Sequence, residues 1–197
     1  MSSSEAGGGH RRGGGRQALI EALVRVAARE RLTQVTTRSV AAEAGVTHGL
    51  VRHHFGTLEA MIEEALAWAA AEAVIGSGLR AEGGDLAALA SDLAVLIDED
   101  PEHAAFQLEV ILEARHREGL RERVQENYDA YHDVVAGSLA RLGLPYDLDL
   151  ARLVFAALNG LVINQLIFGR PEETERGLHW LRRLLEHERV EPSPDRA

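Results

Sequence analysis

The sequence contains no cysteine and no lysine among its 197 residues. Without cysteine there is no disulfide framework, thiolate chemistry or thiolate metal site. Residues 1–15 lack the apolar core that a secretory signal requires. No run of about 18 consecutive apolar residues is present, so we expect no membrane span and a soluble, cytoplasmic protein.

All the cationic side chains are arginines, apart from any protonated histidine, and they are unevenly distributed. Residues 1–56 hold eight arginines and four glutamates, a net charge of +4, although the whole chain carries −10. The rest of the chain therefore carries −14. Such a distribution orients the N-terminal part towards a phosphate backbone and repels the remainder. Arginine can fork to a phosphate or to the edge of guanine, so the lack of lysine does not weaken this expectation.

Residues 36–55, TTRSVAAEAGVTHGLVRHHF, predict two short helices joined by a tight turn. Thr36 and Thr47 are suited to cap them, because a threonine hydroxyl can accept from a free backbone N–H of the first turn. Gly45 stands just after the first helix, where a left-handed backbone favours glycine. The pattern is that of a helix-turn-helix, which presents its second helix, here about residues 48–54, to the DNA major groove.

The run over residues 41–56, AAEAGVTHGLVRHHFG, resembles the DNA-binding motif of the tetracycline-repressor (TetR) family. The AGV turn, Gly49 and the closing HFG carry the resemblance, which extends over residues 16–60. It implies an all-α transcriptional regulator, with a DNA-binding domain over residues 16–56 and a ligand-binding and dimerisation domain over residues 57–190. Residues 1–15 are expected to be a disordered, basic Gly/Ser-rich arm. This arm is either a solvated tail or one whose Arg11 and Arg12, with Arg16, reach the minor groove or nearby phosphates. Residues 191–197 are expected to be a flexible tail. The alternative is a structural helical hairpin that binds no nucleic acid.

The resemblance also assigns residues to the DNA contact. The base-edge positions fall at His48, Leu50 and His53. The full predicted DNA-binding set is Thr36, Thr37, Arg38, Thr47, His48, Gly49, Leu50, Arg52, His53 and His54. Two phosphate-contact positions depart from the family pattern. Arg52 replaces the usual tyrosine and can either make the phosphate contact or reach a guanine. Leu58 replaces the usual lysine and cannot make the contact. The adjacent His53 and His54 point to different sides of a helix, so we expect no metal site there.

The rest of the chain predicts helices, with no strand pattern and no internal repeat. The expected segments are residues 16–31, 57–75, 85–98, a helix opening at Pro101, 120–142, 150–168 and 172–189. Residues 150–168 are too apolar all round for one face to lie in water. In the family that the chain resembles, the last two helices pair with those of a partner, and the dimer binds a palindromic operator. The predicted interface residues are Leu161, Ile163, Leu166, Leu178, Leu181 and Leu185. Burial within one subunit is the alternative.

The resemblance further implies a pocket for a small-molecule effector, whose binding releases a repressor from DNA. Candidate lining residues are the polar and aromatic ones set among apolar helices: Trp68, His103, Phe106, Gln107, Tyr128, Tyr131, His132, Asn159, Asn164 and Gln165. Such a mixture is typical of a ligand cavity, although each residue can also serve in the core or at the surface. No catalytic grouping, phosphate loop or metal motif is present, so we expect neither enzymatic activity nor a cofactor. A ligand-independent architectural or activating DNA binder is the other alternative.

Overall fold

The computed structural model describes residues 14–80 and 84–189, and the regular structure in these ranges is helical throughout, which confirms the predicted all-α fold. The elements are α1 (Gly14–Arg29), η1 (Leu32–Gln34), α2 (Thr37–Glu43), α3 (His48–Phe55), α4 (Leu58–Gly76), η2 (Leu86–Ala88), α5 (Leu93–Glu99), α6 (Pro101–Glu113), α7 (Glu118–Arg141), α8 (Leu148–Phe168) and α9 (Pro171–His187). Most of the predicted tail over residues 1–15, and all of that over 191–197, lies outside the described residues. Gly14 and Gly15 are an exception to the expected flexible tail, because they begin α1.

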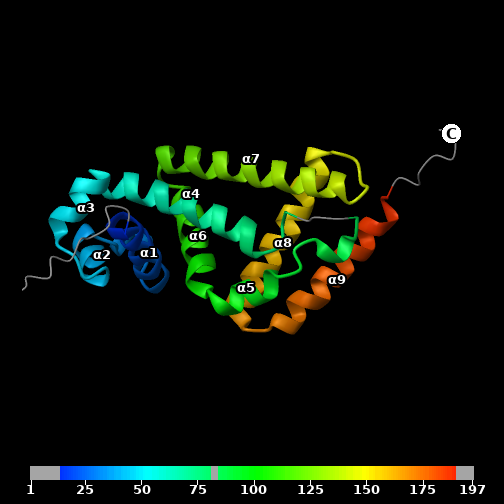
Figure 1. Cartoon of the computed structure of the whole chain (residues 1–197), viewed down its shortest axis with the longest axis horizontal. Coiled ribbons are helices and arrows are strands. Elements are labelled where there is room, and N and C mark those ends of the chain that lie inside the picture. The colour runs from blue at the N-terminus through cyan, green and yellow to red at the C-terminus, as the bar shows by residue number, and fades with distance from the viewer. Residues whose placement is uncertain (1–13, 81–83, 190–197) are drawn as a thin grey trace, which may run out of the picture.

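The helices form an elongated molecule with a head at one end (Figure 1). The head consists of α1, α2 and α3, and α4 leads from it into the body. Figure 1 shows α4 and α7 running along the length of the molecule, with α9 at the end opposite the head. In the body α7 packs on α8 and α8 packs on α9, while α6 packs on α1 of the head. The position of the head is therefore determined by contacts with both α4 and α6.

The helix-turn-helix is shaped by local hydrogen bonds that the sequence predicts. The Thr36 hydroxyl accepts from the backbone N–H of Ser39 at 3.1 Å, and the Ser39 hydroxyl accepts from the N–H of Thr36 at 3.0 Å. This reciprocal capping box begins α2. Gly45 has a φ of 66° in the turn, a conformation that costs other residues about 1–2 kcal/mol. Thr47 occupies the N-cap of α3, but its side chain forms no capping hydrogen bond.

The prediction of one helix over residues 85–98 is wrong in one respect, because this segment forms two elements, η2 and α5. The η2 turn is capped by Asp85, and α5 begins only at Leu93. Between them Ala90 has a φ of 53°, which a continuous right-handed helix does not allow. Arg182 of α9 holds this connection in place by donating from both Nε and Nη2 to the carbonyl of Leu89, at 3.0 and 2.8 Å.

Two hydrophobic clusters hold the molecule together. The first, the head cluster, joins the head to α4, α6 and the start of α7. It includes Leu32 and Phe55, as predicted, together with the fully buried Phe106. The second joins α5, α7, α8 and α9. The head is therefore packed against α4 and α6 through one continuous hydrophobic cluster.

Helix α8 is long and apolar enough, by length and composition alone, to cross a membrane, although no run of consecutive apolar residues suggested this. Core helices of water-soluble proteins meet the same criteria, so they do not identify a membrane span. Only 28% of its apolar window is buried within the chain. Much of α8 is therefore left uncovered by the other helices.

Candidate DNA interface and effector cavity

Helix α3 presents one face to the core and the other to solvent. Val51 is 1% exposed and Phe55 is 9% exposed, as predicted for the inward face. His48, Gly49, Arg52 and His53 are exposed on the outer side. The accessible surface of α3 therefore carries an arginine, two imidazoles and a bare stretch of backbone, which are groups that suit phosphates and base edges.

Two of the predicted DNA-binding residues, Leu50 and His54, lie on the flank of α3 that faces the start of α1. Both are half-buried. A Cβ added to Gly15 would lie 3.7 Å from Leu50 Cδ2 and 3.8 Å from His54 Nε2. Leu50 also packs against the head cluster. Part of each side chain is thus occupied within the head.

Helix α2 supplies the other predicted contacts. The Thr36 hydroxyl is occupied in the capping box. The Thr37 hydroxyl lies 3.0 Å from Nε2 of His48, which links the start of α2 to the start of α3. Arg38 and Thr47 are exposed. Within the described residues, neither Arg38 nor Arg52 forms a salt bridge, so both guanidinium groups are available to an anion.

Other arginines of the head are engaged by glutamates. Glu43 of α2 accepts from Arg25 Nε at 2.9 Å and from Arg29 Nη2 at 2.5 Å. Hydrogen bonds from Arg29 and then Arg25 lower the pKa of Glu43, and the bond to Glu43 raises the pKa of Arg29. Arg16 is paired with Glu64 of α4 and lies 4.8 Å above the ring of Phe55. These arginines therefore fasten α1 to its neighbours.

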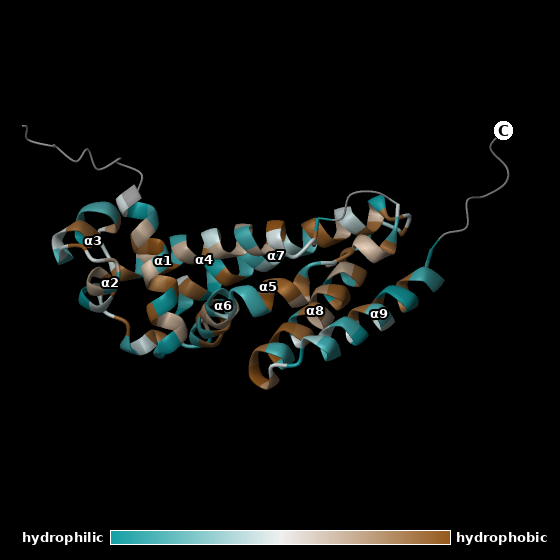
Figure 2. Ribbon diagram, turned by 60° about the horizontal axis from the view of Figure 1, so that its bottom comes forward, coloured by the Kyte–Doolittle hydropathy of each residue, from teal (hydrophilic) through white to brown (hydrophobic). Residues whose placement is uncertain are grey.

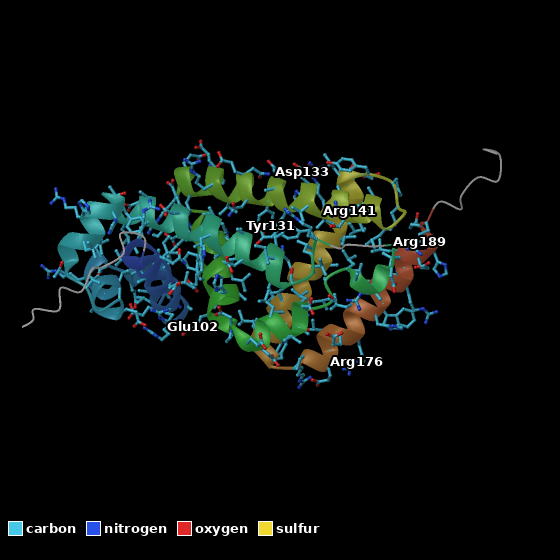
Figure 3. All side chains as sticks on the ribbon, viewed as in Figure 1. Glu102, Tyr131, Asp133, Arg141, Arg176 and Arg189 are labelled. Atoms are coloured by element: carbon cyan, nitrogen blue, oxygen red, sulfur yellow. The ribbon has the colours of Figure 1, made fainter. Side chains whose placement is uncertain are left out.

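A cavity of about 250 Å³ lies in the body, between α4, α5, α6, α7 and α8. Four of the predicted pocket residues line it: His103, Gln107, Tyr131 and Asn159. Tyr131 points from α7 into the body (Figure 3). Ligand sites usually have volumes of about 300–1,000 Å³. This cavity lies just below that range, so it has room only for a small ligand.

The other predicted pocket residues are not among those that line this cavity. Trp68 stands beside it, with its ring 4.6 Å from that of His103. Phe106 faces the opposite side of α6 and is fully buried in the head cluster. Tyr128 and His132 pack edge-on against Phe155, Asn164 is exposed, and Gln165 is buried and donates to the carbonyl of Ala94 at 2.7 Å.

Sequence reasoning missed the apolar part of the lining. Phe155, Leu158 and Val162 of α8 and Leu96 and Ile97 of α5 belong to it. Their side chains are those of ordinary core residues, so nothing in the sequence separates them from the rest of the apolar pattern. Phe155 stacks on Tyr131 with ring centroids 4.7 Å apart, which makes an aromatic wall.

The polar groups on this wall mostly satisfy one another. The Tyr131 hydroxyl lies 3.2 Å from Oε1 of Gln107 and 3.4 Å from the carbonyl of Ala70. Gln107 Nε2 donates to the carbonyl of Ala69 at 3.3 Å. Burial raises the pKa of Tyr131 well above its ordinary value, with the hydrogen bond to Gln107 acting in the opposite direction. Tyr131 is therefore a neutral hydroxyl at physiological pH.

A second cavity, of about 330 Å³, lies between the head and the body. Glu21 and Arg25 of α1 line one side of it, and Trp68, Glu72 and residues at the start of α6 line the other. Glu72, Asp100 and His103 line both cavities. These three side chains thus stand between the body cavity and the head.

The outer face of α8 and α9 is the largest grouping of exposed apolar side chains among the described helices. It consists of Leu153, Ile163, Ile167 and Phe168 on α8 and Trp180 and Leu184 on α9. Figure 2 shows α8 as predominantly hydrophobic along its length. Leu153 and Ile167 are 68% and 64% exposed. Monomeric soluble proteins rarely leave a group of large apolar side chains exposed together on one surface.

The predicted interface residues fall on both sides of these helices. Leu178 and Leu185 are not free for a partner, because they are 1% and 3% exposed in the core of their own chain. Leu161 lies against Gly177 of α9, and Leu181 packs on the same core. Of the predicted set, Ile163 is exposed and Leu166 half-buried.

Comparison with known families agrees with this geometry. Residues 19–65 match the family described as bacterial regulatory proteins of the tetR family. Residues 81–187 match the tetracyclin repressor-like C-terminal domain, and this match spans more than half of the chain. The fold and the exposed α3 define a helix-turn-helix transcriptional regulator. The chain belongs to the TetR family, whose members are DNA-binding proteins and not enzymes.

Solved structures share the fold over most of the chain. A transcriptional regulator from Rhodococcus sp. Rha1 is 24% identical, with a TM-score of 0.72, covering 90% of this chain and 99% of its own. A TetR family member from Streptomyces coelicolor A3 is 26% identical, with a TM-score of 0.70 and coverage of 90% and 99%. The multidrug binding protein EbrR, complexed with imidazole, is 27% identical, with a TM-score of 0.65 and coverage of 92% and 98%. No curated protein matches the sequence.

Proposed function

We propose that the protein is a homodimeric repressor in the cytoplasm, which binds a palindromic operator and is released when a small molecule occupies the body cavity. One observation carries this proposal: the cavity is bounded by α4 and α6, and both helices also contact the head. In this proposal residues 16–56 bind DNA, while residues 57–190 bind the effector and form the dimer.

Helix α4 is the more direct connection between the cavity and DNA. It begins immediately after α3, with the Thr57 side chain capping its first turn. Its last turns, including Glu72, Ala73 and Gly76, form part of the cavity wall. A ligand that displaces this end of α4 also changes the orientation of the head at the other end.

Helix α6 provides a second connection. Ala104, Gln107 and Leu108 line the cavity, while Phe106 and Val110 on the other side of the helix belong to the head cluster. Glu109 accepts a hydrogen bond from the backbone N–H of Leu32 at 3.3 Å. Since one helix packs on both ligand and head, the effector acts by stabilising a different orientation of the head.

The outer face of α8 and α9 forms the proposed dimer interface. Ala157, Gly160 and Ile167 follow Leu153 by four, seven and fourteen residues, which are whole helical turns, so they share its side of α8. Pairing this face with its copy around a two-fold axis covers the exposed apolar side chains. The two α3 helices are then expected about 34–36 Å apart, one turn of DNA.

On the operator, His48 and His53 are proposed to read base edges and Arg52 to grip a phosphate. Arg38 and Thr37 approach the backbone from the start of α2, with Thr47 beside them. Gly49 lets the backbone of α3 come close to the groove. All of these residues except Thr37, which is half-buried, are exposed, and this exposure supports their roles. Leu50, also half-buried, contributes at most a limited apolar contact with a thymine methyl or sugar.

The test begins with selection of the operator from random DNA by the full chain. Fluorescence anisotropy then measures operator affinity during titration with small molecules. An effective inducer must bind the released state roughly 100-fold better, about 2.7 kcal/mol, to shift a balanced equilibrium far. If every compound that binds changes the operator affinity by less than about twofold, the protein is a ligand-independent DNA binder.

A further inference from the structure

The carboxylate and arginine content of the body cavity is one-sided, because its described lining includes acidic residues and no arginine. Glu72 and Asp100 contribute carboxylates, and no arginine is among the lining residues. The chain has no lysine at all. An anionic ligand would have to lie beside two carboxylates without a cation in the lining to offset the repulsion. The lining therefore disfavours carboxylate, phosphate and sulfate ligands.

Most of the remaining wall offers a ligand no hydrogen bond. Gln107 and Tyr131 bond to each other and to backbone carbonyls. The Ser77 hydroxyl accepts from the N–H of Leu79 at 3.3 Å. The aliphatic and aromatic side chains around them are apolar, and Tyr131 and Phe155 form a stacked pair. Apart from Asn159, which forms no hydrogen bond within the described residues, this part of the cavity suits an apolar, aromatic group.

The other polar lining groups without a hydrogen-bond partner in residues 14–80 and 84–189, apart from Asn159, lie at the end of the cavity that faces the head. Glu72 forms no hydrogen bond or salt bridge within the described residues, and its side chain is exposed. His103 Nδ1 lies 2.8 Å from Oδ2 of Asp100. That contact places the proton of a neutral imidazole on Nδ1 and leaves Nε2 an acceptor, and Nε2 is buried without a partner in the described part of the chain. Carboxylates and an acceptor nitrogen at one end suit a hydrogen-bond donor that carries positive charge.

The start of α6 does not reverse this preference. A helix N-terminus attracts anions through its free N–H groups and its dipole. Here Asp100 is the N-cap, and its Oδ1 accepts from the backbone N–H of His103 at 3.2 Å. The protein's own carboxylate thus occupies the position that an anionic ligand would take.

We propose that the effector is a small organic monocation, with an aromatic or aliphatic body in the cavity and an ammonium group against Glu72, Asp100 and His103. This inference rests on the proposed function and names the chemical class of its ligand. Glu72, Asp100 and His103 also line the second cavity, across which Arg25 of α1 stands. The ammonium group therefore binds at the part of the body wall that faces the head.

The test uses three compounds with one carbon skeleton: phenylbutylamine, phenylbutanol and phenylbutyrate. Isothermal titration calorimetry on the full chain measures the affinity of each. The amine is expected to bind at least about tenfold more tightly than the alcohol, because the carboxylates interact with its charge at short range. The acid is expected to bind most weakly.

Glu72→Gln tests the role of the carboxylate, and its exposure means that folding is not at risk. This variant should bring the affinity of the amine towards that of the alcohol and leave the alcohol unchanged. The matched control is Glu59→Gln, which removes an exposed charge from the same helix roughly 20 Å along its axis. The control should retain the preference for the amine.

Ala104→Phe fills the cavity from α6 and should abolish binding of all three compounds, with circular dichroism confirming the fold. If the alcohol or the acid binds as well as the amine and Ala104→Phe removes it, the ligand class is wrong although the cavity is a ligand site. If none of the compounds binds, or Glu72→Gln leaves the preference intact, the proposed class is also wrong. The proposed function is judged separately, by release of the operator.

Discussion

The hydroxyl of Thr37, in the first turn of α2, lies 3.0 Å from Nε2 of His48, the first residue of α3. His48 is exposed, and no other hydrogen bond holds its ring within the described residues. Thr37 thus selects one orientation of an imidazole that we propose to read a base edge. A side chain that is oriented before binding loses less conformational entropy in the complex.

Thr37→Val keeps the shape of the side chain and removes this hydrogen bond. We expect operator affinity to fall by about 1 kcal/mol, the usual contribution of one hydrogen bond. If Thr37 acts through His48, the double variant with His48→Ala will be no weaker than His48→Ala alone. Fluorescence anisotropy on operator DNA measures all three, with Thr33→Val, an exposed threonine of η1, as control. Additive effects would show that Thr37 contacts DNA independently.

Substitution of Arg52 tests whether this residue contacts the phosphate backbone of DNA or reads its base sequence. Arg52→Ala should weaken binding to operator and random DNA alike and reduce the salt slope by about one per half-site. His48→Ala and His53→Ala should instead cost about 1–3 kcal/mol on the operator and little on random DNA. The measurement is affinity against salt concentration on both DNAs.

The control for this experiment is Arg176→Ala, since Arg176 lies on α9, far from the head (Figure 3). It should change neither affinity nor slope. If Arg52→Ala leaves random-DNA binding and the salt slope intact but relaxes the sequence preference, Arg52 is a base reader and the assigned roles along α3 are wrong.

The proposed interface can be broken by a charge on the outer face of α8. Leu153→Glu and Ile167→Glu each place a carboxylate in a surface that the dimer buries, so both should shift the protein to monomers in sedimentation velocity. Leu112 of α6 is equally apolar and 58% exposed, but it lies outside α8 and α9. Leu112→Glu should therefore leave the dimer intact. A wild-type protein that is monomeric at micromolar concentration would contradict the interface.

Local signals explain why the helix-turn-helix can be predicted so closely from sequence. Thr36 and Gly45 act on their immediate neighbours, through one hydrogen-bonded cap and one left-handed backbone conformation. Neither depends on the rest of the fold. The break at Ala90 could not be predicted in the same way, because alanine favours helix and the contact from Arg182 comes from a distant segment.

The cavity and the interface illustrate a second limit. On α6, His103 and Gln107 line the cavity while Phe106 faces the head, yet both faces of the helix are apolar enough to be buried. On α9, Leu178 is in the core and Leu184 is 62% exposed. Hydrophobic periodicity shows that such faces need partners, but only the packing of the whole chain decides which partner each face obtains.

Glu43 makes the stability of the head depend on pH. The hydrogen bonds from Arg29 and Arg25 lower its pKa below the ordinary value of 4.5, so the folded state binds this proton less readily than the unfolded state. The contribution of these hydrogen bonds to the stability of the fold is therefore complete above the ordinary pKa and is lost as the pH falls through the lowered pKa.

The Glu43→Gln variant should be less thermally stable than the wild type at pH 7, and this difference in stability should shrink as the pH is lowered below about 4.5. The effect will be small and screened by salt, because the ion pairs are near the surface. Differential scanning calorimetry between pH 3 and pH 7 measures it, with Glu30→Gln, an exposed glutamate without a salt bridge in the described residues, as control. A difference between Glu43→Gln and wild type that persists undiminished at low pH would show that the ion pairs do not cause it.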